Sequence, residues 1–281
     1  MILTISIFAG LISTISAQGS CVQCATPYLK NNWAITSLPK IPANLIWSDN
    51  CLAASGDDLN EKQATCTNNC FEMLLPLDGN YEVVRGCFAD FVGTDVTEVE
   101  GEHCEANVVT NYGAVKYRTQ TFTAAFTAIR YCKAKSDGTC NNELVSTKVH
   151  NDKIDNCTPG TTVTCKSCGE YDGVGDCSAS TKSTCQGVYC TKTAGKLNGH
   201  WYESRGCAGI NPFGKDICQW NDQVFNISTE INSPDIPSRS KRSIALGFSA
   251  NKCICKGELC NSTSATSIAA AILIALIASI F

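Results

Sequence analysis

The sequence predicts an all-β, disulfide-rich protein built from two similar units in tandem. Three observations lead to this prediction: the cysteine content, a repeat in the cysteine spacing, and β-hairpin turn signals at equivalent places in both repeats. The chain has 281 residues, of which 20 are cysteine. That length is enough for about two domains of common size.

The cysteine content indicates disulfides in an exported protein. Cytosolic proteins rarely keep so many thiols, whereas small secreted modules use disulfides in place of a large core. Zinc binding is the alternative, and it requires repeated Cys-x2-Cys pairs or paired Cys and His. That spacing occurs only at Cys21/Cys24 and Cys165/Cys168, and the chain has three histidines. We therefore expect neither a metal nor a cofactor.

The N-terminus supports export. Residues 1–17 are apolar, carry no charged side chain and end in Ala17 before a polar stretch. This pattern is typical of a secretory signal peptide. A membrane anchor is the alternative, but the stretch is too short to span a bilayer comfortably. An exported chain with a net charge of −4 is a poor candidate for binding nucleic acid.

The two halves share a cysteine pattern. Each opens with Cys-x2-Cys and later has a close pair, Cys66/Cys70 in the first half and Cys185/Cys190 in the second. From Cys70 to Cys87, and from Cys190 to Cys207, the step is 17 residues. Both steps end in Arg-Gly-Cys, so the two halves are internal repeats.

Each 17-residue step contains a hairpin signal. Asp78-Gly79 and Asn198-Gly199 occupy the same offset before the closing cysteine. These dipeptides accept positive φ and form the tight turns of β-hairpins. In the first half, apolar residues alternate with others on both sides of the turn, as in a strand pair with one buried face. The sequence therefore predicts cystine-anchored hairpins at equivalent positions.

This order of cysteines resembles the Ly6/uPAR branch of the three-finger fold. In that family three β-hairpin fingers project from a disulfide-knotted hub, and the domain closes with Cys-Asn. The second half has all ten cysteines followed by Asn261, and Cys140-Asn141 resembles the closing pair of the first half. The resemblance implies a signal peptide (1–17), an atypical first domain with a long first finger (21–141), a linker (142–164), a second domain (165–261) and a removed C-terminal signal (262–281).

The resemblance also implies the disulfides. In the second half the expected pairs are Cys165–Cys190, Cys168–Cys177, Cys185–Cys207, Cys218–Cys253 and Cys255–Cys260. The first half lacks one family cysteine near Ala134, and Cys157 is left over in the connecting segment. The expected pairs there are Cys21–Cys70, Cys24–Cys51, Cys66–Cys87, Cys104–Cys132 and a displaced Cys140–Cys157. An alternative also balances, with Cys104–Cys157 and Cys132–Cys140.

The C-terminal segment predicts a lipid anchor. Residues 262–267 are small and polar, and residues 268–281 are an apolar run of 14. A bilayer span needs about 20 apolar residues. Small residues, a polar spacer and a short apolar end are typical of a glycosylphosphatidylinositol (GPI) signal. Ser262 is the first candidate for attachment, followed by Asn261 and Ser264.

Three further surface features can be read from the sequence. Asn226 and Asn156 lie in N-glycan acceptor triplets. Arg239–Ser243 contains Arg-x-Lys-Arg, which resembles a proprotein convertase site, although an uncut basic loop is the alternative. His200-Trp201-Tyr202 follows the second hairpin turn, and such aromatic residues are good interface anchors. The alternative is that they pack on the face of their own hairpin.

The sequence gives little support for a catalytic function. His103 and His200 have no nearby signature of a hydrolytic site, and His150 lies in the polar connecting segment. We therefore expect no catalytic residue and a non-catalytic binding or modulatory protein, GPI-anchored on the extracellular face of the plasma membrane. Its partner would be a membrane receptor, an ion channel or an extracellular protein ligand. A soluble secreted antagonist or inhibitor of the same fold is the alternative.

Overall fold

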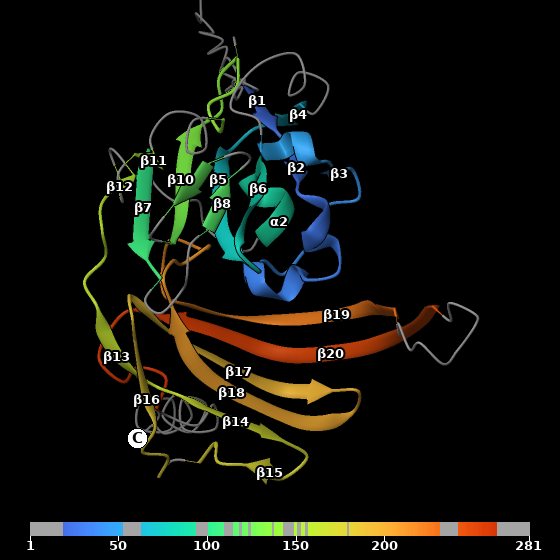
Figure 1. Ribbon diagram of the computed structural model, residues 1–281, viewed down its shortest axis with the longest axis vertical. Helices are drawn as coiled ribbons and strands as arrows, with labels where there is room; N and C mark the ends of the chain where they lie inside the picture. The colour runs from blue at the N-terminus through green and yellow to red at the C-terminus, as the bar shows by residue number, and fades with distance from the viewer. Residues whose placement is uncertain are drawn as a thin grey trace, which may run out of the picture.

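The structure is a computed structural model that describes residues 19–52, 63–93, 101–109, 115–117, 120–122, 125–136, 138–142, 149–150, 153–154, 157–178, 180–230 and 241–262. It contains two β units, one above the other in Figure 1. The first unit runs from β1 to β10 and the second from β13 to β20. The mostly β, disulfide-rich fold class predicted from the sequence is confirmed. A short strand pair, β11 (Val149–His150) with β12 (Lys153–Ile154), lies in the connecting segment.

The first unit has a two-stranded and an eight-stranded sheet. In the small sheet β1 pairs with β4, and the main path of the large sheet is β3-β2-β6-β5-β10-β7. Strand β8 joins this sheet through β6, and β9 pairs with β8. The bounds are β1 Gly19–Val22, β2 Cys24–Ala25, β3 Ile46–Trp47, β4 Gln63–Cys66, β5 Asn69–Leu77, β6 Asn80–Cys87, β7 His103–Val108, β8 Val115–Tyr117, β9 Gln120–Phe122 and β10 Phe126–Lys133. A five-residue helix, α2 (Phe88–Val92), follows β6.

The second unit repeats this plan with three complete hairpins. Its small sheet pairs β13 (Val163–Lys166) with β16 (Thr184–Gly187), and its six-stranded sheet has the order β15-β14-β18-β17-β20-β19. The three hairpins are β14 (Cys168–Tyr171) with β15 (Val174–Gly175), β17 (Tyr189–Leu197) with β18 (His200–Ala208), and β19 (Ile217–Glu230) with β20 (Lys241–Cys255). All three extend to the same side in Figure 1.

The predicted hairpin turns are confirmed by their backbone angles. Both central residues have positive φ, 47° and 79° at Asp78-Gly79 and 52° and 83° at Asn198-Gly199. Positive φ at both positions is the requirement of a type I′ turn, which matches the twist of the flanking strands. The turn of the first hairpin in the second unit, Asp172-Gly173, has the same character, with φ of 52° and 79°.

The long first finger of the first unit is not a hairpin. It folds into the short 3-10 helices η1 (Pro27–Lys30), η2 (Trp33–Thr36) and η3 (Asp49–Leu52), with β3 running parallel to β2. Trp33 is 1 % exposed, and its indole N–H donates to the Leu38 carbonyl at 3.1 Å. The segment therefore supplies core side chains to the first unit instead of a projecting finger.

Eight of the ten expected disulfides are present as predicted. They are Cys21–Cys70, Cys24–Cys51, Cys66–Cys87, Cys165–Cys190, Cys168–Cys177, Cys185–Cys207, Cys218–Cys253 and Cys255–Cys260. Two groups of three cysteines have their sulfur atoms within 4.8 Å of one another, and every one of these sulfurs is in a disulfide. Their closeness therefore reflects the knotted hub of the first unit.

The pairs Cys104–Cys132 and Cys140–Cys157 were wrong, and the alternative pairing is the one that forms. Cys104 bonds to Cys157, and Cys132 bonds to Cys140. The strand register explains the difference, because Cys104 on β7 lies opposite Arg130 and is offset by two residues from Cys132. The connecting segment instead runs beside β7, where the Thr158 N–H donates to the Cys104 carbonyl at 2.9 Å.

An asparagine closes the hub of each unit. The amide of Asn141 accepts from the Val22 N–H at 2.9 Å and donates to the carbonyls of Val22 and Phe71 at 2.8 and 3.0 Å. Asn261 makes the equivalent bonds to Lys166 at 2.9 and 3.0 Å and to Thr191 at 2.9 Å. Val22 and Lys166 follow the first cysteine of their repeats, so the two hubs are built alike.

The arginine of each Arg-Gly-Cys motif is also buried and ion-paired. Arg85 contacts Glu72 at 2.6 Å, and both side chains are fully buried. Arg205 contacts Glu203 at 2.8 Å, with 3 % of the arginine side chain exposed. Glu72 reaches Arg85 from the neighbouring strand β5, whereas Glu203 lies two residues before Arg205 on the same strand. Both repeats therefore have a buried, ion-paired arginine at this position, but the glutamate that pairs with it comes from a different place in each repeat.

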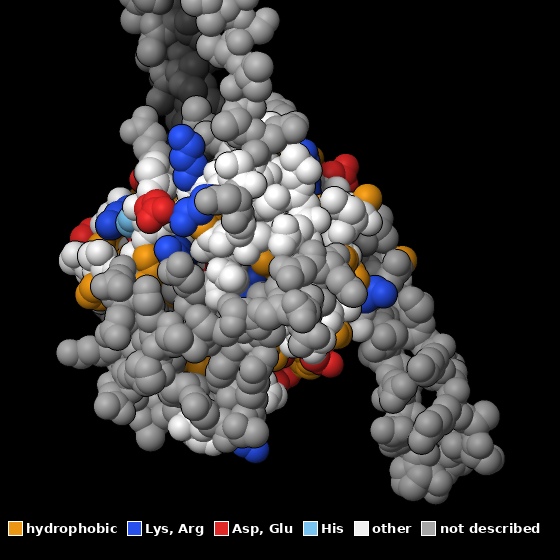
Figure 2. Space-filling view, turned by 90° about the horizontal axis from the view of Figure 1, so that it is seen from above, with side chains coloured by type: hydrophobic (Ala, Val, Ile, Leu, Met, Phe, Trp, Pro, Cys, Tyr) orange, Lys and Arg blue, Asp and Glu red, His pale blue; other side chains and the backbone are white. Residues whose placement is uncertain are grey.

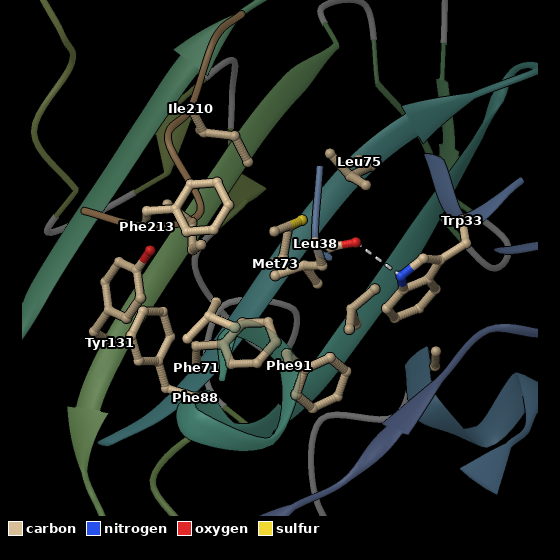
Figure 3. Packing of buried hydrophobic residues seen from close by; sticks show 14 of the residues in the cluster. Trp33, Leu38, Phe71, Met73, Leu75, Phe88, Phe91, Tyr131, Ile210 and Phe213 are labelled. Carbon is tan, nitrogen blue, oxygen red and sulfur yellow. Dashed lines mark hydrogen bonds between the residues drawn. The ribbon is translucent and has the colours of Figure 1, made fainter. Parts of the chain in front are cut away.

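The two units share one hydrophobic core. On the face of the first unit that points away from the second sheet, the visible hydrophobic side chains form small separate spots among polar ones (Figure 2). Toward the second sheet, Phe71 and Tyr131 belong to the same buried cluster as Ile210, Phe213 and Ile254 of the second unit. Figure 3 shows Phe213 and Ile210 beside the aromatic side chains of the first unit. The units are therefore packed together through apolar contacts.

The glycines of the two Arg-Gly-Cys motifs provide a matched test of the packing. A Cβ at Gly86 would lie 2.1 Å from Phe91, whereas a Cβ at Gly206 would meet only Thr191, at 3.5 Å. We expect Gly86→Ala to destabilise the protein by about 1–3 kcal/mol through overpacking. Gly206→Ala should change the free energy of unfolding by less than about 0.5 kcal/mol. Chemical denaturation with the disulfides intact measures both, and equal effects would contradict this account.

Candidate binding surface

The inner face of the second sheet is covered by the first unit. Side chains alternate between the two faces along each strand. On the inner face, Ile254 joins the shared core, and the Gln219 amide donates to the Val92 carbonyl at 2.9 Å. The Lys252 ammonium donates to the Ala34 carbonyl at 3.3 Å. The first unit therefore contacts the inner face of the second sheet near the hub.

The outer face of the same sheet presents two exposed tryptophans. Trp201, Lys196, Ser249 and Asp222 form one row across β18, β17, β20 and β19. Trp220 lies two residues before Asp222 and so shares its face. Trp201 is 48 % exposed and Trp220 is 60 % exposed. We call Trp201, Trp220, Lys196 and Asp222 the tryptophan face.

The structure separates the three residues that the sequence grouped at the second hairpin. Trp201 is on the outer face, and His200 and Tyr202 are on the inner side because they are its direct neighbours in the strand. The Tyr202 ring is half-buried, with its centroid 6.4 Å from that of Phe248. Tyr202 therefore packs against its own sheet. The Trp201 side chain is exposed and available to a partner.

The tip of the second hairpin is bonded to the turn of the first hairpin and to the middle of β20 in the third. The His200 ring contacts the Asp172 carboxylate at 3.2 Å, and the Asp172 N–H donates to the Trp201 carbonyl at 2.8 Å. Asn198 exchanges two hydrogen bonds of 2.7 Å with the backbone of Gly247. The three hairpins therefore form one continuous sheet as far as the turn of the second hairpin, beyond which the third hairpin extends alone. The tryptophan face lies on the continuous part of this sheet.

Sequence reasoning missed several exposed apolar residues. Trp220 follows Cys218 closely, and Tyr171 and Val174 flank the Asp172-Gly173 turn with 41 % and 79 % exposure. The Asp-Gly dipeptide was a signal for that hairpin and its tip. No local pattern marks Trp220, because its exposure depends on which sheet face the first unit covers.

A groove of about 770 Å³ lies between the two units. Its wall includes Val108, Phe126, Pro159 and Val188, and none of the described residues that line it is charged. Asn107 lies in this wall, and its side chain bonds the backbone on both sides of the groove. Its amide donates to the Gly209 carbonyl at 2.5 Å and accepts from the Gly160 N–H at 2.7 Å. The groove is therefore a feature of the docked pair of units.

Two buried tyrosines add polar contacts to the interface between the units. The Tyr189 hydroxyl donates to the Glu105 carboxylate, with oxygen distances of 2.6 and 2.8 Å, and the Tyr131 hydroxyl donates to the Asn211 carbonyl at 3.2 Å. Burial raises the pKa of Tyr189, and the adjacent carboxylate raises it further. Burial also raises the pKa of Tyr131, again with a contribution from Glu105. Both hydroxyls are therefore held in the protonated form.

The histidines considered for catalysis lie apart. His103 contacts Glu105 at 3.1 Å in the first unit, and His200 contacts Asp172 in the second. For His150 the structure describes only the backbone, which pairs with Lys153. Every described cysteine is in a disulfide, so none of these thiols is available as a nucleophile.

Comparison with family models, curated protein sequences and solved structures finds no match for this chain. Its relationship to known proteins therefore depends on the motifs and geometry described above. Among the described residues, no helix is both long and apolar enough to cross a membrane.

The structure places only some of the predicted modification sites. Asn226 lies in β19, opposite Ala245 of β20. Arg242 of the basic segment lies in β20 opposite Thr229, so a protease that binds extended substrates would first have to open this hairpin. Asn261 is 3 % exposed in the hub. Residues 1–17, Asn156, Arg239 and Ser264 lie outside the described residues.

The two buried tyrosines predict alkaline sensitivity. Because their pKa values in the folded state are raised above the usual value of about 10, the unfolded chain loses these protons first as the pH rises. The stabilisation that these two hydroxyls contribute is therefore complete below about pH 10 and decreases as the pH rises above it. Tyr189→Phe should reduce the loss of the denaturation midpoint between pH 9 and 11. An unchanged pH dependence in this variant would contradict the assignment to Tyr189.

Proposed function

We propose that this chain is a two-unit member of the Ly6/uPAR superfamily that acts as a non-catalytic binding protein at the cell surface. The observation that carries the proposal is the closing asparagine of each unit. Asn141 and Asn261 bond the strands after the first and fifth cysteines of their repeats, beside a disulfide-rich hub. The three hairpins that leave the second hub support a three-finger unit there.

The tryptophan face is the proposed binding surface for an extracellular protein or a membrane receptor. Trp is enriched among the residues that dominate binding energies, because it buries a large area with little loss of conformational freedom. Trp201 and Trp220 lie on the face that the first unit leaves uncovered, with Lys196 and Asp222 between them. Charges of both signs beside aromatic anchors favour a specific protein partner.

A GPI anchor on the outer face of the plasma membrane is part of the same proposal. It rests on the sequence pattern after Asn261, a small polar stretch followed by a short apolar run. The hub ends at this asparagine, so an anchor close behind it would hold the second unit near the membrane. The fingers, and with them the tryptophan face, extend to one side of that hub.

The binding proposal predicts a face-specific loss. Trp201→Ala and Trp220→Ala should each reduce saturable binding of the soluble chain to partner-bearing cells by at least tenfold, as expected for anchors worth about 2 kcal/mol. Tyr171→Ala is the matched control, because this exposed aromatic lies at the tip of the same sheet on the opposite face. Flow cytometry measures the binding, and equal losses in all three variants would argue against the tryptophan face.

The anchor proposal predicts release from cells. Treatment of intact expressing cells with phosphatidylinositol-specific phospholipase C should transfer the protein to the medium, which immunoblotting of both fractions measures. A mock-treated sample is the control. Protein found in the medium of untreated cells would favour the soluble secreted antagonist or inhibitor.

A further inference from the structure

The connecting segment covers only part of the outer edge of β7. This strand is the last one in the large sheet of the first unit, and the connecting segment runs past it in Figure 1. The Thr158 N–H donates to the Cys104 carbonyl at 2.9 Å, and the Ala106 N–H donates to the Thr158 carbonyl at 3.4 Å. Two residues later, the Gly160 N–H donates to the Asn107 side chain at 2.7 Å, so the segment no longer follows the strand backbone. The edge of β7 is therefore open beyond Thr158.

The direction of the backbone groups shows what this open edge offers. In an antiparallel pair, the N–H and C=O groups of successive residues point alternately toward the partner strand and away from it. The Val109 N–H points toward the β10 side, where it donates to the Ala125 carbonyl at 2.8 Å, so the groups of Val108 point outward. Ala106 has the same orientation, since its N–H meets Thr158. The Val108 N–H and the carbonyls of Val108 and Ala106 form no hydrogen bond with the described part of the chain.

These open backbone groups lie at the groove between the two units. Ala106 and Val108 are among the residues that line this groove of about 770 Å³. The second unit contributes Val188 and Ala208 to the same lining. Val108 is 55 % exposed, so the edge is accessible from solvent. A ligand bonded to this edge would therefore contact both units.

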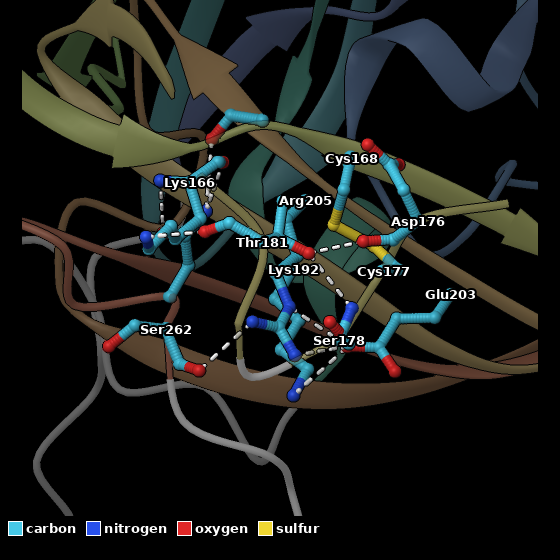
Figure 4. Close-up of a disulfide and its surroundings, with 12 residues drawn as sticks. Lys166, Cys168, Asp176, Cys177, Ser178, Thr181, Lys192, Glu203, Arg205 and Ser262 are labelled. Carbon is cyan, nitrogen blue, oxygen red and sulfur yellow. Dashed lines mark hydrogen bonds and ion pairs between the residues drawn. A yellow bond between two sulfur atoms is a disulfide. The ribbon is translucent and has the colours of Figure 1, made fainter. Parts of the chain in front are cut away.

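The groove also lacks charge. None of the described residues that line it is charged. The charged side chains at the hub of the second unit are engaged elsewhere, since Arg205 contacts Glu203 at 2.8 Å and donates to the Ser262 carbonyl at 2.9 Å (Figure 4). A charged group entering the groove would lose its hydration without meeting an opposite charge. The groove therefore favours an uncharged ligand.

We propose that this groove binds an extended, uncharged segment of a partner protein, which adds as a strand to the open edge of β7. The Val108 N–H donates to a carbonyl of the segment, and the carbonyls of Val108 and Ala106 accept from its N–H groups. All three bonds form whether the segment runs parallel or antiparallel to β7. Its apolar side chains pack against the lining, which includes Phe126 and Val188. This is a second binding site, separate from the tryptophan face on the outer side of the second sheet.

The bonds of Thr158 on the same edge support this mode of binding. This residue already accepts from Ala106 and donates to Cys104, and the proposed segment repeats the pattern one step farther along the strand. In strand addition, backbone bonds supply affinity and side-chain pockets supply specificity. A compact apolar ligand would displace water from the three edge groups and leave them without partners, which is costly. The open edge therefore favours a peptide over such a ligand.

Amide exchange of the mature, ¹⁵N-labelled protein tests the inference by NMR. The probe is a pool of blocked hexapeptides with random Ala, Ser, Thr, Val and Leu residues, at about 1 mM in total, which saturates sites of micromolar affinity. In the free protein the Val108 amide should exchange fast and the Val109 amide slowly. The pool should slow exchange at Val108 by about tenfold or more and leave Val109 unchanged. Unchanged exchange at Val108 would overturn the inference.

Two control pools separate strand addition from simple apolar contact. A fully N-methylated pool keeps the side chains but has no N–H groups to donate to the edge carbonyls. A pool with Glu and Lys at alternate positions keeps the backbone but adds charge. Each should slow exchange at Val108 by less than about twofold. Equal protection by the N-methylated pool would contradict strand addition, and equal protection by the charged pool would contradict the choice of an uncharged segment.

Variants of Val108 test the backbone bond directly. Val108→Pro removes the edge N–H, and proline is tolerated in an edge strand where that group faces outward. Val108→Thr is the matched control, because it keeps the N–H and the branched shape. In equilibrium dialysis with the uncharged pool, Val108→Pro should bind about a tenth or less of the peptide that Val108→Thr binds. Equal binding would contradict the inference, and if Val108→Pro fails to fold, amide exchange of the unsubstituted protein decides the question.

Other occupants of the edge would be visible in the free protein. Slow exchange at Val108 without peptide would show that the chain itself covers the edge. Protection that increases with protein concentration would show pairing between two copies. Either result would overturn the inference. Trp201→Ala should leave the protection by peptide unchanged, and failure at Val108 would leave the proposed tryptophan face in place, because cell binding tests that face separately.

Discussion

Each β unit depends on one buried asparagine side chain that joins two strands at the disulfide hub, those that follow the first and fifth cysteines. The amide of Asn141 or Asn261 satisfies backbone groups at the points where the first and fifth cysteines leave the hub. These groups are buried, so without a partner they would carry the full desolvation cost. The disulfides bring the strands together, and the asparagine fixes their relative positions. The hairpins that start at the hub are therefore held in fixed positions relative to one another.

Docking of the two units then decides which surfaces are available. The first unit has an enlarged core, because its first finger folds back as short helices carrying Trp33 and Leu38. This core continues into Ile210 and Phe213 of the second unit, and hydroxyls such as that of Tyr131 bond across the junction. The inner face of the second sheet is covered near the hub as a result. A partner of the second sheet therefore meets its outer face or the finger tips.

The repeats have diverged most clearly in their buried charges. Arg85 and Arg205 occupy the same place, and each has a carboxylate within ion-pair distance. In the first unit Glu72 lies between two arginines, opposite Arg85 on β6 and opposite Arg130 on β10. In the second unit Lys192 takes that position, and Glu203 supplies the carboxylate from the same strand as the arginine.

Local chemistry and the internal repeat are enough to predict several features of this protein. Asp78-Gly79 and Asn198-Gly199 specify tight turns because those residues accept positive φ. The resemblance to the Ly6/uPAR pattern implied the eight disulfides that form and a closing Cys-Asn in each unit. The tertiary structure decided the rest. Cys104 pairs with Cys157 because the connecting segment runs beside β7, and Trp201 is exposed because the first unit covers the other face of its sheet. Both outcomes depend on contacts between segments far apart in the chain, which no local pattern specifies.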